Sequence, residues 1–140
     1  MTAKKKRNTE EASLQRAVVQ HLIFRGVPGL IFFAVPNGMV SDPVSVARMK
    51  AQGLMPGAPD LMIFVPPDEP FDDTKWPYPL CLELKSAKGR LSEAQAQFEV
   101  DCNRIRLAYE VAFNIDEALE ILEFYGALRA DANTKIARAA

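Results

Sequence analysis

The sequence is poor in the residues that build disulfide frameworks and zinc sites. It has two cysteines and one histidine among 140 residues, and it has no Cys-x-x-Cys pair. These counts exclude a disulfide-stapled scaffold and argue against a structural zinc site, which takes four Cys or His ligands. We expect Cys81 in a strand and Cys102 in a helix, both as reduced core residues.

Long hydrophobic runs and a large net charge of either sign are also missing. No apolar stretch approaches the roughly 20 residues of a membrane span, and no signal-peptide core follows the basic N-terminus, so a cytoplasmic protein is expected. A net charge of −1 and a pI near 5.9 lack the basic excess of many nucleic-acid-binding proteins. The charges are clustered, however: residues 4–7 and 85–90 are basic, and the loop of residues 68–73 is acidic.

Three charged residues stand at or inside two segments that otherwise have the composition of buried strands. Asp60 precedes the apolar residues 61–65, and Glu83 and Lys85 belong to the segment Leu80-Cys81-Leu82-Glu83-Leu84-Lys85. Because strand side chains alternate between faces, Glu83 and Lys85 share one face. If the two strands form a hairpin, the Asp60 carboxylate can lie beside Glu83.

This grouping predicts a site for a hard divalent cation. Mg²⁺ takes oxygen ligands from one or two carboxylates, and Asp60 and Glu83 supply such a pair. A neighbouring lysine can orient or help deprotonate an attacking water, and it can offset charge on a phosphate. The ordinary alternative is that Glu-x-Lys lies on the wet face of a strand and that Pro59-Asp60 is a turn.

The first expected helix places an acidic residue at the head of its apolar stripe. It runs from an N-cap at Asn8 to Arg25, and its stripe of leucine and valine leads back to Glu11, with Gln15 beside it. Asn8 and Glu11 also fit a capping box, which explains the glutamate without a function. The two explanations do not exclude each other.

A later helix repeats this arrangement. Ser92 is its expected N-cap, and a buried stripe of Phe98, Cys102 and Ile105 leads back to Gln95. Gln95 stands at the third helical position, so a capping box again offers an alternative to a ligand role. The N–H groups at such a helix start favour anions.

The expected elements follow the order α-β-α-β-β-α-β-α. Strands are predicted near residues 30–35, 61–65, 80–85 and 109–113, the first of them buried, and the remaining helices at residues 42–53 and 116–125. The pattern predicts an α/β domain with a mixed four-stranded sheet flanked by helices. We expect a basic flexible arm at residues 1–9, a domain at 10–126, a tail at 127–140, and an inserted Pro-rich loop at 66–79.

These landmarks together resemble the VRR-NUC domain family of the PD-(D/E)xK nuclease superfamily. The resemblance spans about residues 10–126 and departs from the family in the long acidic loop of residues 66–79. The matching features are Glu11 with Gln15, Pro36-Asn37-Gly38, Gly53, Pro56-Gly57-Ala58-Pro59-Asp60, Leu82-Glu83-Leu84-Lys85, and Gly89-Arg90-Leu91-Ser92 followed by Gln95.

The resemblance implies a restriction-endonuclease-like core and a Mg²⁺- or Mn²⁺-dependent endonuclease that hydrolyses DNA phosphodiester bonds. Asp60 and Glu83 would bind the metal, with Glu11 assisting directly or through water. Lys85 would act on the attacking water, and Gln95 would support the lysine or the scissile phosphate.

The resemblance also suggests a substrate and a setting. Similar stand-alone proteins are often phage-encoded, and some act as homodimers on branched DNA such as Holliday junctions. Possible DNA contacts are Asn37, Lys88, Arg90 and Gln15. Two other functions stay open at this point: a catalytically silent DNA-binding module, and an interaction protein that acts through the loop of residues 66–79.

Overall fold

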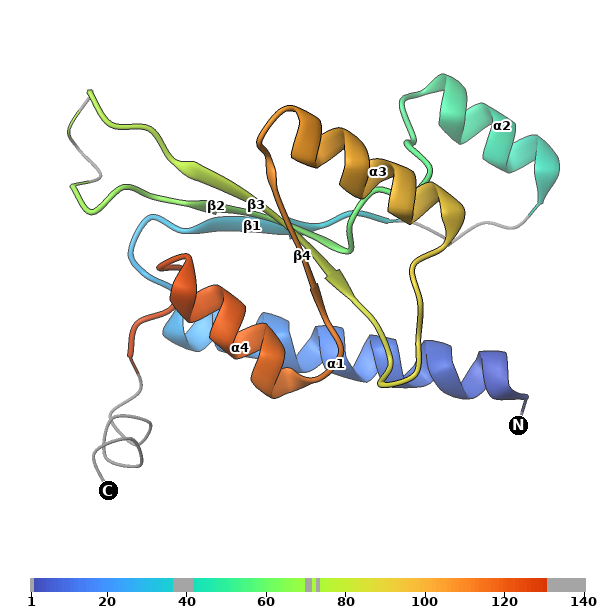
Figure 1. The fold of residues 1–140 in the computed structure, drawn as a ribbon, viewed down its shortest axis with the longest axis horizontal. Coiled ribbons are helices and arrows are strands. Elements are labelled where there is room, and N and C mark those ends of the chain that lie inside the picture. The colour runs from blue at the N-terminus through green and yellow to red at the C-terminus, as the bar shows by residue number, and fades with distance from the viewer. Residues whose placement is uncertain (1, 37–41, 70–71, 73, 131–140) are drawn as a thin grey trace.

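The fold is an α/β arrangement with helices on both faces of one mixed sheet (Figure 1). The computed structural model describes residues 2–36, 42–69, 72 and 74–130. The order is the expected one: α1 (Ala3–Arg25), β1 (Ile31–Ala34), α2 (Pro43–Ala51), β2 (Leu61–Val65), β3 (Tyr78–Leu84), α3 (Glu93–Arg104), β4 (Ala108–Ala112) and α4 (Ile115–Phe124). Among these helices, none is both long and apolar enough to span a membrane.

The sheet has the spatial order β1-β2-β3-β4. β2 pairs antiparallel with both β1 and β3, which confirms the expected hairpin, and β4 returns through α3 to lie parallel to β3. Figure 1 shows α1 and α4 below the sheet, α3 above it, and α2 standing to one side.

The alternation of side chains along β3 divides the interior into two clusters. Leu80, Leu82 and Leu84 point towards α1 and α4 and are at most 1% exposed. Burial of each leucine side chain contributes about 2 kcal/mol relative to an exposed one. Cys81 points the other way, towards Cys102 of α3. The opposite faces predicted for these residues are therefore confirmed.

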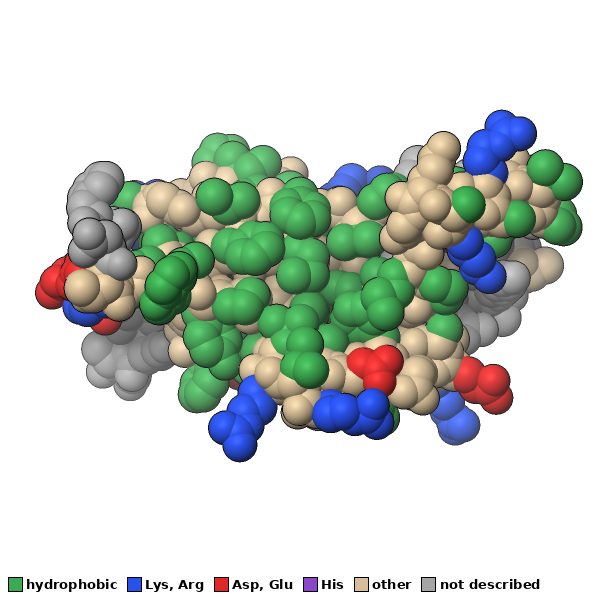
Figure 2. Space-filling view, turned by 90° about the horizontal axis from the view of Figure 1, so that it is seen from above, with side chains coloured by type: hydrophobic (Ala, Val, Ile, Leu, Met, Phe, Trp, Pro, Cys, Tyr) green, Lys and Arg blue, Asp and Glu red, His purple; other side chains and the backbone are tan. Residues whose placement is uncertain are grey.

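The upper face of the sheet is covered over only one half. α3 packs on β4, and among the residues that the structure describes no helix lies above β1. Ile31 and Phe33 of β1 are 62% and 50% exposed, so the prediction that the first strand is buried is wrong. A hydrophobic run predicts burial only if another element covers it, and Figure 2 shows hydrophobic side chains gathered across the middle of this face.

The predicted beginning of the first helix is also wrong. α1 begins at Ala3, so Asn8 lies inside the helix and caps nothing, and residues 4–7 form helical turns instead of an irregular arm. Good helix formers such as alanine and lysine allow the helix to extend past an internal asparagine. The capping explanation for Glu11 is therefore removed.

Two further boundaries differ from the prediction. Ile105 is 72% exposed because α3 ends at Arg104, so Ile105 is the C-cap and does not continue the buried stripe. The domain also extends beyond residue 126, because Ala127 and Leu128 are buried and Leu128 forms an isolated bridge with Gly26.

A glycine holds the loop before β2 against the start of α3. Gly57 has φ +83°, and a Cβ atom there would lie 2.2 Å from the carbonyl oxygen of Ala94. Only a residue without a side chain allows this close approach. Gly57 therefore sets the position of the loop that delivers the chain to Asp60.

We predict that Gly57→Ala lowers the free energy of unfolding by about 2 kcal/mol or more, because it adds a steric clash to the strain of a positive φ. Urea denaturation measures the change. Gly53→Ala is the matched control: Gly53 has φ +105° but no atom within 4 Å of the added Cβ, so strain alone should cost about 1 kcal/mol. Equal losses in the two variants would contradict the role of the Ala94 contact.

Candidate active site

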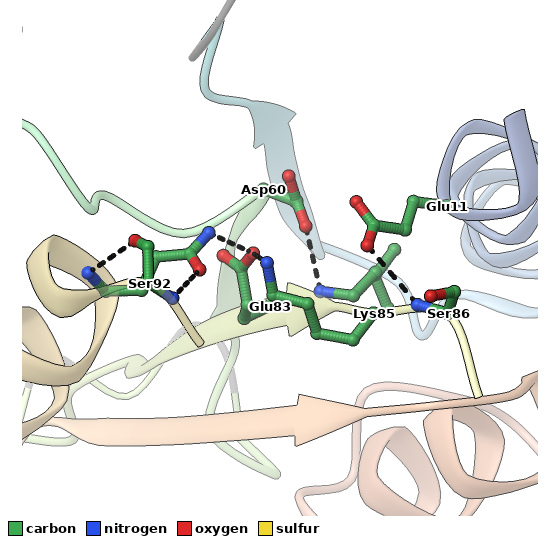
Figure 3. Close-up of polar contacts among 8 residues, drawn as sticks. Glu11, Asp60, Glu83, Lys85, Ser86 and Ser92 are labelled. Atoms are coloured by element: carbon green, nitrogen blue, oxygen red, sulfur yellow. Dashed lines mark hydrogen bonds and ion pairs between the residues drawn. The ribbon is translucent and has the colours of Figure 1, made fainter. Parts of the chain in front are cut away.

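The register of the β2–β3 hairpin brings two carboxylates together. Leu61 lies opposite Leu82, so Asp60 at the start of β2 lies opposite Glu83. The backbone N–H of Leu84 donates a hydrogen bond of 2.8 Å to Oδ2 of Asp60, which orients that carboxylate. Glu83 is only 2% exposed. Figure 3 shows the two side chains projecting into the same space beside Lys85.

Lys85 supplies the positive charge of this group. Its Nζ lies 3.6 Å from Oε1 of Glu83, and both side chains are largely withdrawn from solvent. A buried pair of this kind is costly to desolvate, so it is weak evidence for stability. The placement of Glu83 and Lys85 on one face is the one that strand alternation predicts.

Gln95 joins α3 to the same group. Its Oε1 accepts a hydrogen bond from the N–H of Ser92, and the Ser92 hydroxyl accepts one from the N–H of Gln95, which completes the capping box. Its Nε2 donates a hydrogen bond of 2.8 Å to Oε1 of Glu83. One side chain therefore caps the helix and contacts Glu83: the capping box is confirmed, and the role of Gln95 in the site stays a prediction.

Glu11 approaches the group from α1 on the other side (Figure 3). Its Oε1 accepts a hydrogen bond of 3.4 Å from the backbone N–H of Ser86, which directly follows Lys85. Across the described part of the chain, no three carboxylate, cysteine or histidine groups form a cluster that could hold a metal ion. Glu11 therefore stands outside the pair formed by Asp60 and Glu83.

The electrostatics of the carboxylate pair oppose the presence of two full negative charges. Burial raises the pKa of Glu83 to about 8, and repulsion from Asp60 adds to the rise while Lys85 opposes it. Burial likewise raises the pKa of Asp60, against the lowering effect of the Leu84 N–H. The metal-free site thus favours retention of a proton.

The donor set fits a hard divalent cation. Oε2 of Glu83 is buried and, among the described residues, has no hydrogen-bond partner. A buried acceptor without a donor is rare unless an ion or water satisfies it. Carboxylate oxygens from Asp60 and Glu83 are the ligand type that Mg²⁺ and Mn²⁺ take, and a cation would allow both to ionise.

The other predicted contact residues differ in their exposure to solvent. Gln15 is half-buried, one helical turn after Glu11, and Lys88 and Arg90 are exposed in the loop between β3 and α3. Asn37 lies outside the described residues.

Sequence reasoning missed the backbone donors of the site, and it placed Gly57 in the motif before Asp60 without predicting its contact with α3. The N–H groups of Leu84 and Ser86 orient Asp60 and Glu11, and Gly57 positions the loop before Asp60. Backbone N–H groups cannot be recognised in a sequence, because nearly every residue type has one. A glycine three residues before Asp60, in contrast, can be recognised there.

We predict that Glu83 makes the metal-free protein less stable as the pH rises. The folded state holds the proton up to about pH 8, whereas the unfolded chain releases it near the ordinary value of 4.5. The stabilisation is fully present below the unfolded pKa and is lost between these two values. Urea denaturation in a chelator at about pH 5 and pH 8 measures the slope.

Glu83→Gln should flatten this slope, because the amide cannot titrate and its oxygen can still accept the Gln95 hydrogen bond. Glu93→Gln, at an exposed position in the first turn of α3, controls for the loss of a carboxylate. A slope in Glu83→Gln as steep as that of the wild-type protein would show that another group causes it.

Comparison with known proteins extends this description. No protein-family model and no curated protein matches the sequence. A solved structure of a VRR_NUC domain protein matches this chain with a TM-score of 0.64 and 20% sequence identity, over 83% of this chain and 87% of that chain. At this identity the likeness is one of fold, and it agrees with the mixed sheet and flanking helices described above. The chain therefore has the fold of a VRR-NUC domain, as its sequence resemblance predicted.

Proposed function

We propose that this protein is a metal-dependent endonuclease that hydrolyses DNA phosphodiester bonds. The observation that supports it most directly is the buried Asp60–Glu83 pair, with one unsatisfied oxygen and Lys85 at 3.6 Å. A pair of carboxylates kept buried beside a lysine costs stability, which is typical of a site retained for chemistry. The VRR-NUC fold supports the same reaction class.

Asp60 and Glu83 would hold the Mg²⁺ or Mn²⁺ ion, with Glu11 contributing through a water molecule. When bound, the cation would offset the negative charge that develops on the phosphate oxygens in the transition state. The preorganised backbone donor at Leu84 and the amide of Gln95 keep the two carboxylates in place.

Lys85 would act on the attacking water and on the phosphate. Its ammonium group can donate hydrogen bonds to both, which positions the water for in-line attack and neutralises developing charge. Gln95 would support this arrangement by holding Glu83, and its position at the start of α3 places helix N–H groups nearby.

The charge distribution supports a nucleic-acid substrate despite the net charge of −1. Lys88 and Arg90 are exposed just beyond the end of β3 that carries Glu83, whereas Asp68, Glu69 and Asp72 lie in the loop at its other end. Phosphate contacts can therefore form next to the site without interference from the acidic loop. Gln15 and Asn37 complete the proposed DNA-contacting set.

A homodimer that cuts branched DNA, such as a four-way junction, is the form of this activity that we propose. The uncovered face of β1 and β2 is the surface we assign to the second copy. It exposes Ile31 and Phe33, and the edge of β1 is unpaired in the described part of the chain. A groove of about 670 Å³ adjoins it, lined by Pro28, Phe64 and Pro66 among others.

This surface suits contact with its own copy because it carries almost no charge. In a two-fold interface the same patch meets itself, so charged residues at its centre would face like charges. Lys75 is the charged residue lining the groove. Apolar patches of this kind on soluble proteins commonly mark association sites.

We predict metal-dependent cleavage of labelled DNA in Mg²⁺ or Mn²⁺, strongest on a four-way junction and weaker on flapped and linear duplexes. Asp60→Asn and Lys85→Met should each reduce the cleavage rate by about 100-fold or more, because the first weakens the hold on the metal ion and the second removes an ammonium group that stabilises the transition state. Single-turnover cleavage, followed by gel electrophoresis, measures the rates.

Asp101→Asn and Arg104→Gln, which alter an exposed ion pair at the end of α3, are the matched controls and should cut like the wild-type protein. DNA binding without cleavage by the wild-type protein in either metal would favour a silent binding module. Neither binding nor cleavage would point to an interaction protein.

The predicted dimer is tested separately. Light scattering at micromolar concentration should give twice the chain mass for the wild-type protein, and Phe33→Glu should give a monomer with an unchanged fold, because a buried interface carboxylate would lose its hydration. Phe124→Glu, at an 83% exposed position on α4, is the control and should remain a dimer. A monomeric wild-type protein would count against paired cutting.

A further inference from the structure

The helix α2 is the part of the described structure that packs least. None of its residues is buried, and no other described helix or strand packs against it. Asp42 caps its first turn by accepting hydrogen bonds from Ser45, and Pro43 begins it. A nine-residue helix held only by its ends is marginal in water, so a surface that covers it would stabilise it.

Its side chains are arranged in an ordered way around the axis. Ser45, Val46 and Met49 are half-covered and mark the side towards the body of the protein. At about 100° per residue, the opposite side consists of Val44, Ala47 and Ala51, all exposed. The outer ridge of α2 is therefore small and uncharged.

Two cations flank this ridge on opposite sides. Arg48 and Lys50 are two residues apart, so they project about 200° apart around the helix. Both are exposed, and neither side chain has a hydrogen bond or ion pair with any residue that the structure describes, although both backbone carbonyls accept hydrogen bonds at the end of the helix. The helix itself, residues 43–51, contains no acidic residue.

We infer that α2 inserts into a groove of duplex DNA beside the scissile phosphate, with Arg48 and Lys50 each contacting a phosphate on one wall. The major groove is about 12 Å wide and admits one helix, and the small outer ridge allows close approach. Residues 52–59 connect α2 to Asp60, so eight residues of chain join this helix to the site. The inference rests on the proposed nuclease function for its substrate.

This contact depends little on DNA sequence. Val44, Ala47 and Ala51 have no side-chain hydrogen-bonding groups, so the ridge cannot form hydrogen bonds with base edges, and the affinity comes mainly from the phosphates. A second copy of this chain is the other candidate for covering α2. Within the described part of the chain, Arg48 and Lys50 have unpaired side chains, and the helix has no acidic residue, so DNA is favoured over a second copy.

The test is equilibrium binding of a labelled duplex in a chelator, measured by fluorescence anisotropy at several salt concentrations. Arg48→Gln with Lys50→Gln should weaken binding by about 10- to 100-fold at 0.1 M salt and lower the slope of log K against log salt by about 1.8. The loss should be equal on two duplexes of unrelated sequence, and the melting temperature should not change.

Arg104→Gln with Arg106→Gln removes two exposed cations at the far end of α3 and is the matched control, with little expected change. Ala47→Glu places a carboxylate on the ridge and should weaken binding more than Ala47→Gln, which adds the same bulk without the charge. Glutamate and glutamine have similar helix propensities, so folding is not the variable.

The outcomes separate this inference from the proposed function. A wild-type protein that binds duplex through α2 but does not cut it supports the inference and overturns the nuclease. Cleavage by a protein whose α2 variants bind as tightly as wild-type overturns the inference alone. An equal loss of DNA affinity in the Arg104 and Arg106 control would also overturn it. So would a variant of Arg48 and Lys50 that changes its oligomeric state but not its affinity for DNA.

Discussion

The pairing register between β2 and β3 is the constraint on which the site depends. It sets Asp60 opposite Glu83, and strand alternation then puts Lys85 on the same side as Glu83. A slip of one residue would turn Glu83 into the cluster below the sheet and expose Leu82 or Leu84. The three leucines of β3 oppose such a slip, because each would lose its burial. Burial of these leucines thus fixes the positions of Asp60, Glu83 and Lys85 on the other face of the sheet.

The same arrangement lowers the stability of the folded state. Asp60 and Glu83 repel each other in a buried place, and only Lys85 and a few hydrogen-bond donors offset that repulsion. Contacts with rigid elements keep the two carboxylates in place despite this repulsion. Gln95 holds Glu83 from α3, and Gly57 locks the preceding loop to the same helix turn. A divalent cation would relieve the repulsion, so the binding of a metal ion here would be coupled to folding.

The uneven covering of the sheet leaves two chemically different open surfaces on the described part of the chain. The lower face is closed by α1 and α4, whereas the upper face leaves β1 and β2 open and α2 standing apart (Figures 1 and 2). Apolar and basic surfaces are thus separate: one suits another protein surface, and the other suits a polyanion. The near-neutral net charge does not conflict with this, because Asp68, Glu69 and Asp72 lie before β3, whereas Lys88 and Arg90 lie beyond its other end.

Local pattern in the sequence determined the order of the elements, the two faces of β3 and the group of Asp60, Glu83 and Lys85. These follow from alternation and turn chemistry, which act over a few residues. The start of α1 and the exposure of Ile105 were mispredicted, because helix ends depend on propensities that differ by tenths of a kcal/mol. The burial of β1 was mispredicted because it depends on whether a helix crosses above it.

Only the tertiary structure decided which polar residues meet. The sequence marked Glu11 and Gln95 as candidates with an equally good capping explanation for each. Folding made Gln95 both a cap and a partner of Glu83, and it removed the capping explanation for Glu11. It also recruited the backbone N–H groups of Leu84 and Ser86. Such contacts join residues far apart in the chain, and their geometry is set by packing rather than by residue type.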